Sequence, residues 1–452
     1  MKLLDPGHRK IGILGVGREG QAARQYLRSL NPELVLDLIS ESPPDPEFAA
    51  TLLEQDRAIN GPLSQAALEH YDLLIRSPGI SPYRQSLQRA KLAGVEITTP
   101  SNLWFAAHPL EKTICVTGTK GKSTTSTLIA HALQSCGHRV RLAGNIGLPL
   151  LSCEDRDVDW WVIELSSYQL TDLDAAPTVA VILNLTAEHL DWHGGEQAYR
   201  KDKLRLAELA AGSVLVANAA DLSLAEALST YSNICWFNSR SGIHVESSRI
   251  LDGPRVLPLI LPEGLPGAHN LANTAAALTV LRVLGEEEET SLRAVSSFRS
   301  LPHRLQLVGE RSGLRYVNDS ISSTPVSTAA ALEALAGQSI TLILGGLDRG
   351  LDWSPYMTAF KTCPAQAVIA IPENGERILD TMRSAGLQPE AGLHQVAGLN
   401  EAVKLAQRIT PAGGTVLLSP GAPSFPQFAD YRDRGKQFAN LCGFELKEKD
   451  IW

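Results

Sequence analysis

The most specific chemical signal in this sequence is a glycine-rich segment, VTGTKGKST, at residues 116–124. Gly118 and Gly121 would let backbone amides converge on phosphate oxygens, Lys122 would add a positive charge, and the hydroxyls after it could reach Mg²⁺. The strict G-x-x-x-x-G-K-[ST] pattern is broken because position 116 is valine, but every working part of a phosphate loop is present. The segment therefore favours ATP or GTP binding over a lysine-containing surface turn. The predicted contacts are Gly118, Thr119, Lys120, Gly121, Lys122, Ser123 and Thr124.

A second glycine pattern, G-x-G-x-x-G, is formed by Gly15, Gly17 and Gly20 directly after the apolar run KIGIL. In that position the glycines permit a tight turn and a close approach of the backbone to a phosphate. Asp37 follows at about the spacing of a ribose-binding carboxylate. The motif alone leaves open a nicotinamide or flavin cofactor, another nucleotide, or a tight turn without a ligand. Residues 77–80, Ser-Pro-Gly-Ile, also follow an apolar run and could form a second turn that faces a ligand.

Acidic and imidazole side chains follow two later apolar runs. Glu164 ends the run WWVIE, and the segment NLTAEHLDWHG at residues 184–194 carries two carboxylates and two histidines. Side chains at the carboxyl ends of parallel strands point into the ligand crevice, so we interpret His189 as functional rather than structural. Zinc is less favoured because no cysteine partner accompanies the histidines in this segment. Mg²⁺ bound together with phosphate oxygens fits these residues better.

The elements that must position these residues follow an alternating α/β order. Short apolar runs alternate with longer amphipathic or Ala/Leu-rich stretches, which predicts mostly parallel sheets with crossover helices. Strands are expected at Ile11–Gly15, Leu34–Leu38, Leu73–Arg76, Thr113–Thr117, Trp160–Glu164, Val179–Asn184, Ser213–Asn218, Thr341–Gly345, Ala367–Ile371 and Thr415–Ser419. Helices are expected at Gly20–Leu30, Ser123–Cys136 and Asn270–Leu284, and the acidic run Glu286–Glu289 is expected to be a loop or a helix start. Seams near residues 108–112 and 301–305 divide the chain into expected domains 1–110, 111–303 and 304–452.

Composition limits the class of protein. The chain has 452 residues, 44% of them hydrophobic and 20% charged, as in an ordinary globular protein. Its formal net charge of −8 disfavours a nucleic-acid or anionic-membrane binder. The six cysteines lie far apart without a C-x-x-C motif, which indicates a reducing compartment. No apolar run approaches the length of a membrane span and the N-terminus shows no signal-peptide pattern, so we expect a cytoplasmic protein.

The order of several short motifs resembles that of the Mur ligases, the ATP-dependent amide ligases that build the peptidoglycan stem peptide. These motifs are GTKGKST, ELSSYQ, EHLDWH, YRKDK, HNLAN and LPHRL. The resemblance covers nearly the whole chain. It implies a Rossmann-like N-terminal domain for a UDP-linked substrate, a central P-loop ATPase-like domain with a mostly parallel sheet, and a Rossmann-like C-terminal domain for the incoming amino acid. It also implies an acyl-phosphate mechanism, in which ATP phosphorylates the carboxylate of the substrate before an amine attacks it.

The same resemblance implies roles for individual residues. Ser123 and Glu164 would hold one Mg²⁺, and His189 and Lys203, the lysine as a carbamate, would serve a second. Lys122, His189 and Lys203 would be catalytic. The implied nucleotide contacts beyond the phosphate loop are Asn270, Asn273, Arg304 and Asp319. The implied contacts of the UDP substrate, in place of NAD, are Gly15, Gly17, Arg18, Glu19, Asp37, Ser77, Gly79 and Asn145.

Departures from the family pattern concentrate in the expected glutamate site. Where the D-glutamate-adding members read N-D-S-K-A-T-N and S-P-A-C-A-S, this chain reads NDSISSTP at residues 318–325 and SPGAPS at residues 419–424. Ile321 thus replaces a lysine, whereas Arg349 is retained and could clamp a carboxylate. These segments, with GREGQAA and SPGISPY, resemble a smaller branch that adds L-glutamate to UDP-N-acetylmuramoyl-L-alanine, after which a separate epimerase inverts the added residue. The expected glutamate contacts are Ser323, Arg349, Ser424, Phe425 and Tyr431.

Other classes of protein explain fewer of these residues. An NAD-dependent dehydrogenase would leave GTKGKST unexplained, a folylpolyglutamate synthase lacks the UDP-binding N-terminal domain, and a GTPase-like switch would need an N-K-x-D motif. A non-catalytic nucleotide-binding protein is disfavoured because every expected catalytic side chain is present. A D-glutamate-adding ligase is the alternative within the family. We expect a monomer whose C-terminal domain swings inward to assemble the site.

Overall fold

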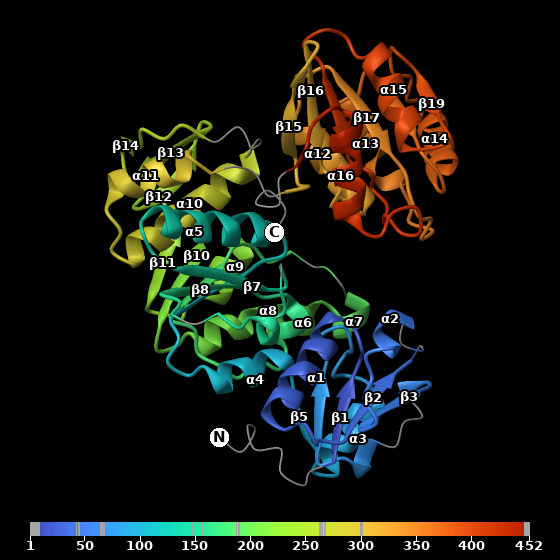
Figure 1. Cartoon of the computed structure of the whole chain (residues 1–452). Helices are drawn as coiled ribbons and strands as arrows, with labels where there is room; N and C mark the ends of the chain where they lie inside the picture. The colour runs from blue at the N-terminus through green and yellow to red at the C-terminus, as the bar shows by residue number, and fades with distance from the viewer. Residues whose placement is uncertain are drawn as a thin grey trace. The chain divides into compact units, whose positions relative to one another are not determined.

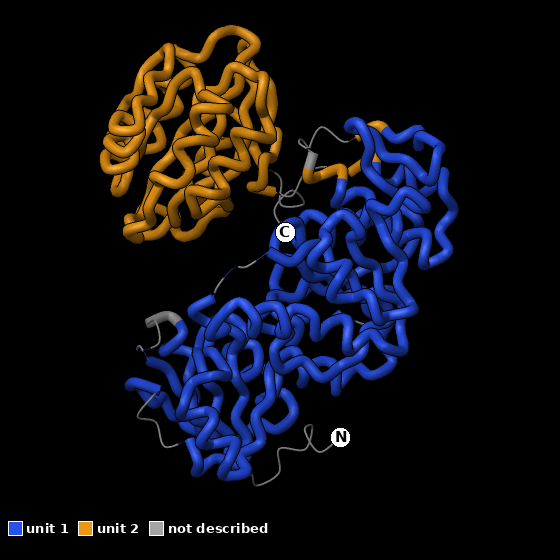
Figure 2. Tube along the Cα trace, turned by 180° about the vertical axis from the view of Figure 1, so that it is seen from behind, with its two compact units in different colours: residues 1–259, 272–295 blue, residues 260–271, 296–452 orange. Residues whose placement is uncertain are grey.

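The computed structural model describes residues 10–41, 43, 46–63, 68–146, 148–155, 157–186, 188, 190–261, 265, 268–298 and 302–446. The chain divides into two compact units, shown in different colours in Figure 2. The first, hereafter unit 1, comprises Met1–Leu259 and Ala272–Val295. The second, hereafter unit 2, comprises Ile260–Leu271 and Ser296–Trp452.

The first sheet of unit 1, drawn in blue in Figure 1, is parallel, and its strand order reverses at the centre. From β1 the chain moves outward through β2 to β3, then returns to β4 on the other side of β1 and continues to β5. Ligands of open α/β sheets bind at the carboxyl ends of the strands at such a reversal, so the loops after β1 and β4 form a candidate crevice. The strands are β1 (Ile11–Leu14), β2 (Leu36–Ser40), β3 (Asp56–Asn60), β4 (Leu73–Arg76) and β5 (Glu96–Thr98). The helices are α1 (Arg18–Leu30), α2 (Pro46–Ala49), η3 (Leu68–His70), α3 (Gln85–Leu92) and α4 (Pro100–Ala107).

The second sheet of unit 1 has the order β11-β10-β9-β6-β8-β7, and all its strands are parallel. Because β8 and β9 flank β6, the segments that follow these three strands meet at one edge of the sheet. The strands are β6 (Thr113–Thr117), β7 (Val140–Gly144), β8 (Trp160–Glu164), β9 (Val179–Ile182), β10 (Val214–Asn218) and β11 (Ile234–Phe237). The helices are α5 (Lys122–Ser135), η4 (Leu150–Ser152), α6 (Ser167–Leu170), α7 (Leu190–His193), α8 (Glu196–Leu209) and α9 (Leu222–Ala227).

A small antiparallel sheet and two helices follow. The sheet consists of β12 (Ile243–Glu246), β13 (Arg249–Asp252) and β14 (Arg255–Val256). The helices are α10 (Ala268–Val283) and α11 (Glu288–Ser296). The acidic run at residues 286–289 leads into α11, which confirms its interpretation as a helix start.

Unit 2 is built on one sheet with the order β15-β16-β20-β17-β18-β19. β15 is antiparallel to β16, and the other neighbours are parallel. The strands are β15 (Gln306–Arg311), β16 (Leu314–Asn318), β17 (Ile340–Leu344), β18 (Ala367–Ala370), β19 (Leu393–Gln395) and β20 (Thr415–Leu418). The helices are α12 (Pro325–Ala334), η5 (Ser354–Tyr356), α13 (Met357–Thr362), α14 (Gly375–Ser384), α15 (Leu399–Ile409) and α16 (Tyr431–Leu441).

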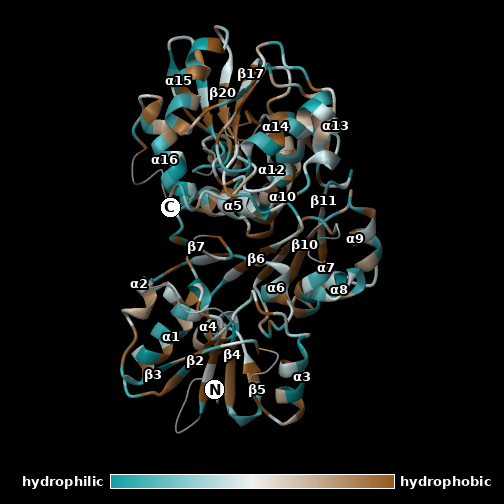
Figure 3. Ribbon diagram, turned by 90° about the vertical axis from the view of Figure 1, so that its right-hand side faces the viewer, coloured by the Kyte–Doolittle hydropathy of each residue, from teal (hydrophilic) through white to brown (hydrophobic). Residues whose placement is uncertain are grey.

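The cores lie between these sheets and their helices. Central strands such as β6 and β17 are buried along their whole length, as expected for parallel strands covered on both faces, and they are largely brown in Figure 3. Helices bury only one stripe. In α15 the buried positions are Leu399, Ala402, Val403 and Ala406, which follow the helical spacing of i, i+3, i+4 and i+7.

The α/β class predicted from the alternation of apolar runs is confirmed. The predicted strands and helices occur with ends displaced by at most about two residues, the usual uncertainty of sequence-based boundaries. The strands that were not predicted are β3, β5, β7, β11, β15, β16, β19 and those of the antiparallel sheet β12–β14. In the part of the chain that the structure describes, no helix is long and apolar enough to cross a membrane.

Candidate active site

The phosphate loop connects β6 to α5 in unit 1. At Gly121, φ is +84° and a Cβ would overlap the Asn273 side chain, so glycine is required there. At Gly118 a Cβ would lie 2.9 Å from Leu183 Cβ, which is also too close. Helix α5 begins at Lys122, so the amides of its first turn are available to an anion. This local geometry fits a loop that binds phosphate.

Two lysines reach the same carbonyl oxygen of this loop. Lys122 Nζ donates to Gly118 O at 2.9 Å and to Thr119 O at 3.0 Å, and Lys203 Nζ donates to Gly118 O at 3.0 Å. Lys203 extends from α8 and is only 2% exposed. Burial, reinforced by the charge of Lys122, lowers the pKa of Lys203 to about 7. Near neutral pH a substantial fraction of this amine is therefore uncharged.

Glu164, at the end of β8, has one bonded and one unpartnered carboxylate oxygen. Oε1 accepts a hydrogen bond from Asn145 Nδ2 at 2.6 Å. Oε2 is buried and has no hydrogen-bond partner among the described residues. A buried carboxylate oxygen requires a donor or a cation, and carboxylates are preferred ligands of Mg²⁺. The side chain therefore fits a magnesium ion beside the phosphate loop.

The segment after β9 folds onto the phosphate loop. The Asn184 side chain accepts from Lys120 N at 2.8 Å and donates to Lys120 O at 3.0 Å, while Lys120 Nζ pairs with Glu188 Oε1 at 2.7 Å. His189 lies outside the described residues, so its predicted role stays a prediction. Among the residues that are described, no group of three or more His, Cys, Asp or Glu side chains is arranged to hold a metal. An ion at Glu164 would take its other ligands from hydroxyl groups, phosphate oxygens and water.

Of the predicted nucleotide contacts on α10, Asn273 approaches this loop. Asn270 and Asn273 lie three residues apart on α10, on one helix face, and are 5% and 6% exposed. The Asn273 amide lies directly against Gly121. Ser123 and Thr124 occupy the first turn of α5. The structure thus brings the predicted loop residues and Asn273 together.

The two loops at the strand reversal of the first sheet line a cavity of about 450 Å³. Ser77 Oγ donates to Gly15 O at 3.0 Å, so the loops after β1 and β4 are in contact. A Cβ at Gly20 would overlap Gly15 O, so this packing of α1 onto β1 requires glycine. The cavity is lined by seven of the residues predicted to bind the UDP substrate: Gly15, Gly17, Arg18, Glu19, Ser77, Gly79 and Asn145.

Glu19 has an unusual electrostatic environment in this cavity. Burial raises its pKa to about 7, although the charge of Arg18 and a hydrogen bond from Gln169 act in the opposite direction. That bond runs from Gln169 Nε2 to Glu19 Oε1 at 3.2 Å. A carboxyl group that is partly protonated at neutral pH repels an anionic ligand less than a full carboxylate does.

Asp37 does not join this group. It lies near the start of β2 (Leu36–Ser40), not at the carboxyl end of the strand, and it is 5% exposed. Its Oδ2 accepts a hydrogen bond from Tyr71 OH at 2.8 Å. Asp37 is absent from the set of described residues that line the cavity.

Asp319 occupies the loop after β16 in unit 2 and is 2% exposed. It accepts hydrogen bonds from Ser322 Oγ at 2.6 Å, Ser419 Oγ at 2.7 Å and Leu305 N at 3.1 Å. Burial raises its pKa to about 6. The predicted neighbour Arg304 is exposed, and its positive charge opposes that rise.

Arg434, on α16, holds two loops of unit 2 together. It is fully buried and donates to Ser320 O at 2.8 Å and to Ala422 O at 3.0 Å. β16, β20 and β17 are neighbours, so the loops after them share one edge of the sheet. The predicted glutamate contacts come from these loops and from the segment that starts α16: Ser323, Arg349, Ser424, Phe425 and Tyr431.

One departure from the family pattern has a structural reason. Gly421 has a φ of +63°, and a Cβ there would overlap the buried ring of Trp353, with Cζ2 at 2.6 Å. The alanine of the S-P-A-C-A-S pattern therefore does not fit beside this tryptophan. Ile321, which replaces a lysine, is 36% exposed. The loop edge is rebuilt around an indole and an aliphatic side chain.

Several residues that line the 450 Å³ cavity were not predicted from the sequence. They come from the second sheet of unit 1: Gly144, Pro149, Ser166, Tyr168 and Gln169. A usable signal was the S-x-x-Q pattern of Ser166 and Gln169, which forms a capping box at the start of α6. It marks a helix start directly after a strand, where ligand-facing residues gather.

Three family models match this chain in order. The MurD-like N-terminal domain of Mur ligases matches residues 9–99, the Mur ligase middle domain matches residues 116–281, and the glutamate ligase domain of Mur ligases matches residues 303–421. The chain belongs to the Mur ligase family.

Two relatives with higher sequence identity carry the same enzyme name. A protein of Xylella fastidiosa named UDP-N-acetylmuramoyl-L-alanine–L-glutamate ligase is 41% identical over 96% of this chain and 95% of its own length. A protein of Salinispora tropica with the same name is 38% identical over 97% of this chain and 98% of its own length.

Solved structures support the fold alone, because their sequence identity is low. UDP-N-acetylmuramate-alanine ligase MurC from Thermotoga maritima is 20% identical, covers 96% of this chain and 99% of its own, and has a TM-score of 0.60. MurF ligase from Thermotoga maritima, solved in complex with ADP, is 15% identical, covers 98% of both chains and has a TM-score of 0.58.

Proposed function

We propose that this protein ligates L-glutamate to the alanyl carboxylate of UDP-N-acetylmuramoyl-L-alanine, using ATP. The observation that carries the proposal is the convergence of Lys122 and Lys203 on Gly118 O in the phosphate loop, beside the unpartnered oxygen of Glu164. The names of relatives that are 41% and 38% identical over nearly the whole chain support the choice of substrates. The Mur ligases depend on ATP, so membership of this chain in that family supports the use of ATP.

The reaction needs an activated carboxylate. A carboxylate oxygen of the substrate attacks the γ-phosphorus of ATP, the bond to the β-phosphate oxygen breaks, and an acyl phosphate and ADP form. The amine of glutamate then attacks the acyl carbon through a tetrahedral intermediate, and phosphate leaves. Lys122 would hold the transferred phosphoryl group by its charge, which is the main contribution a protein makes to such transfers.

We propose that Mg²⁺ is the metal and that Glu164 and Ser123 hold it. Bound there, the ion would neutralise phosphate charge as two anions approach each other. Asn145 Nδ2 fixes one oxygen of Glu164 and so directs the other. Asn145 also lines the 450 Å³ cavity, which would place the alanyl end of the substrate near this carboxylate.

We further propose that Lys203 is carbamylated. Its low exposure and its pKa of about 7 support this, because the uncharged amine is the form that adds CO₂. A carbamate would convert a cation into an anionic metal ligand. His189, outside the described residues, is proposed to act with it on a second ion.

The glutamate contacts proposed for unit 2 are Ser323, Arg349, Ser424, Phe425 and Tyr431. The rebuilt edge at Gly421 and Ile321 supports a pocket that differs from that of the D-glutamate-adding members. We also propose that the three domains span residues 1–110, 111–303 and 304–452. The protein would be a cytoplasmic monomer that acts in peptidoglycan precursor synthesis. A separate epimerase would then act on its product.

Phosphate release from the purified protein tests the proposal. The assay contains UDP-N-acetylmuramoyl-L-alanine, ATP and Mg²⁺ with L-glutamate, with D-glutamate or with neither, and mass spectrometry identifies the product. Turnover with L-glutamate alone is expected. Turnover with D-glutamate alone would contradict the assignment of the amino acid, and no turnover with either would contradict the ligase assignment.

A further inference from the structure

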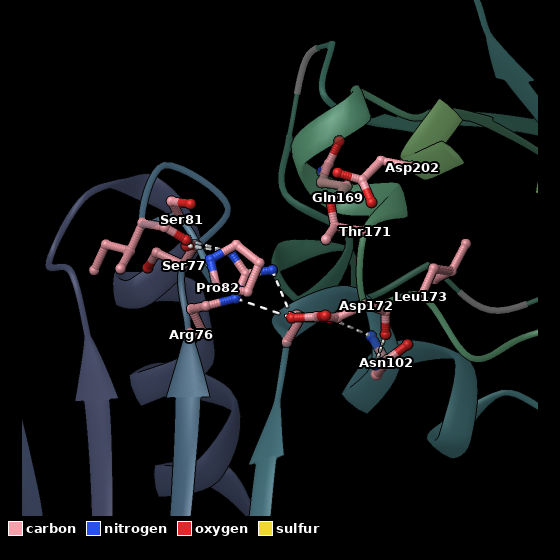
Figure 4. Close-up of polar contacts among 12 residues, drawn as sticks. Arg76, Ser77, Ser81, Pro82, Asn102, Gln169, Thr171, Asp172, Leu173 and Asp202 are labelled. Atoms are coloured by element: carbon pink, nitrogen blue, oxygen red, sulfur yellow. Dashed lines mark hydrogen bonds and ion pairs between the residues drawn. The ribbon is translucent and has the colours of Figure 1, made fainter. Parts of the chain in front are cut away.

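The loop that follows β4 is held at several points by the second sheet region of unit 1. This segment, residues 77–83, is hereafter called the substrate loop, because its first residues line the 450 Å³ cavity. The first point is Arg76, which is fully buried. Its Nε and Nη2 donate to Asp172 Oδ2 at 3.1 and 2.9 Å, and its Nη1 donates to Ile80 O (Figure 4). A buried guanidinium must be paired, so this contact strongly resists separation.

Trp192 provides the second point. Its Nε1 donates to Gly79 O at 3.1 Å, and its carbonyl oxygen accepts from Ser81 Oγ at 2.7 Å. Its ring stacks on Tyr168 at a centroid distance of 4.2 Å. Since Gly79 and Tyr168 both line the cavity, the wall of the cavity depends on this contact.

The third point is a chain of hydrogen bonds that runs from Tyr83 through Asp202, the residue before Lys203, to Ser167. Tyr83 OH lies 2.9 and 3.0 Å from the two oxygens of Asp202, the residue before Lys203 on α8. Asp202 Oδ2 also bonds His193 Nδ1 at 2.6 Å, and His193 Nε2 bonds Ser167 Oγ at 3.0 Å. Asp202 and His193 are 5% and 1% exposed.

The order Ser167, His193, Asp202 matches that of a hydrolytic triad, but its surroundings do not. Ser167 is only 4% exposed, so its oxygen is closed to a substrate carbonyl. The carboxylate is shared with a tyrosine of the substrate loop, which a hydrolytic triad does not require. The chain of bonds therefore connects segments instead of activating a nucleophile.

We propose that Tyr83 and Asp202 are positioning residues that lock the substrate loop onto helix α8 next to Lys203. One carboxylate then joins three parts: the loop that contacts the UDP substrate, the ELSSYQ segment after Glu164, and the helix that carries Lys203. This inference rests on the proposed function. A loop fixed before binding saves the substrate the entropy of ordering it, so the effect should appear in substrate affinity.

The test is the steady-state kinetics of Tyr83→Phe in the full-length protein. The variant removes one hydroxyl and leaves the ring. We expect the KM for UDP-N-acetylmuramoyl-L-alanine to rise about tenfold, the size expected when one hydrogen bond to a carboxylate is lost. The KM for ATP should stay unchanged. A smaller folded fraction would lower the apparent kcat and leave both KM values as they are, so the split separates positioning from folding.

Asp202→Asn and the double variant Tyr83→Phe/Asp202→Asn complete a double-mutant cycle. If the two residues act as one unit, the double variant should resemble the more impaired single variant, whereas additive effects would contradict the proposal. Tyr231→Phe is the matched control, because it removes a hydroxyl from a half-buried tyrosine that packs against the core of the second sheet. Its KM values should equal those of the wild type.

The outcomes separate the two proposals. An inactive wild type would overturn the ligase function and the inference that depends on it. An active wild type with an unchanged KM for the UDP substrate in Tyr83→Phe would overturn the positioning role alone.

Discussion

Lys122 and Lys203 come from different helices and donate to one carbonyl oxygen, that of Gly118, at 2.9 and 3.0 Å. Burial lowers the pKa of Lys203 to about 7, and the repulsion between the two ammonium groups reinforces this shift. Conversion of Lys203 to a carbamate would replace this repulsion by attraction. The proximity of Lys122 therefore favours carbamylation of Lys203.

The first prediction concerns Lys203→Arg. Arginine keeps the positive charge and cannot form the carbamate, so we expect kcat to fall by at least about a hundredfold, as for loss of a major electrostatic contact. Carbon-13 NMR of protein equilibrated with labelled bicarbonate should show a carbamate signal that is lost in the variant. Lys201→Arg, an exposed position on the same helix, is the control and should keep both activity and signal. Full activity in Lys203→Arg would contradict the carbamate.

The second prediction concerns Glu164→Gln. The amide can still accept the bond from Asn145, but it lacks the charge that a metal ion needs. We expect the Mg²⁺ concentration for half-maximal activity to rise about tenfold or more. Titration of activity with Mg²⁺ measures this, with Glu196→Gln at an exposed site as the control. An unchanged Mg²⁺ requirement would remove Glu164 from the metal site.

The sequence was sufficient for features that depend on short-range pattern. The phosphate loop at residues 116–124, the glycine turn at Gly15 and the turn at Ser77 could each be located, because their spacing and preceding strand determine the backbone. For the turns at Gly15 and Ser77, the sequence predicted only that both lie at the same edge of one sheet. Their hydrogen bond, from Ser77 Oγ to Gly15 O, depends on strand order.

Hydrogen bonds between residues far apart in the chain could not be predicted from the sequence. Nothing local to Tyr83 indicates that its hydroxyl meets Asp202, which lies 119 residues later. Asp37 illustrates the opposite error, because the expected ligand contact lies within β2 and is a buried partner of Tyr71. Side-chain burial and strand ends are set by tertiary packing, which propensity alone does not determine.

The third prediction concerns Gly421→Ala. The added Cβ would overlap the Trp353 ring at a left-handed φ, so we expect unit 2 to lose about 1–3 kcal/mol of stability. Chemical denaturation followed by fluorescence measures the change. Gly413→Ala is the matched control: its φ is +80° and the space around it is open, so it carries backbone strain without overlap.

Trp353→Phe should rescue this defect. The smaller ring removes the indole atoms that the new Cβ would strike and leaves only Thr328 Oγ1, at 2.8 Å. The double variant Gly421→Ala/Trp353→Phe should therefore be more stable than the sum of the single effects predicts. The KM for glutamate should rise in Gly421→Ala and recover in part in the double variant. Strict additivity would show that Gly421 and Trp353 are not coupled.

The last prediction is a pH dependence of substrate affinity set by Glu19. Its pKa is raised to about 7, so the carboxyl is mainly neutral below that pH and gains a negative charge above it. The UDP substrate carries a diphosphate, and we expect its Kd to rise as the pH increases through about 7. Glu19→Gln should bind at least as tightly as the wild type and lose this dependence, whereas Glu33→Gln, an exposed position, should keep it. Calorimetric titrations between pH 6 and pH 8.5, without ATP, measure binding apart from the reaction. If the Kd changed with pH in the same way in the wild type and in Glu19→Gln, Glu19 would not be the source of the pH dependence.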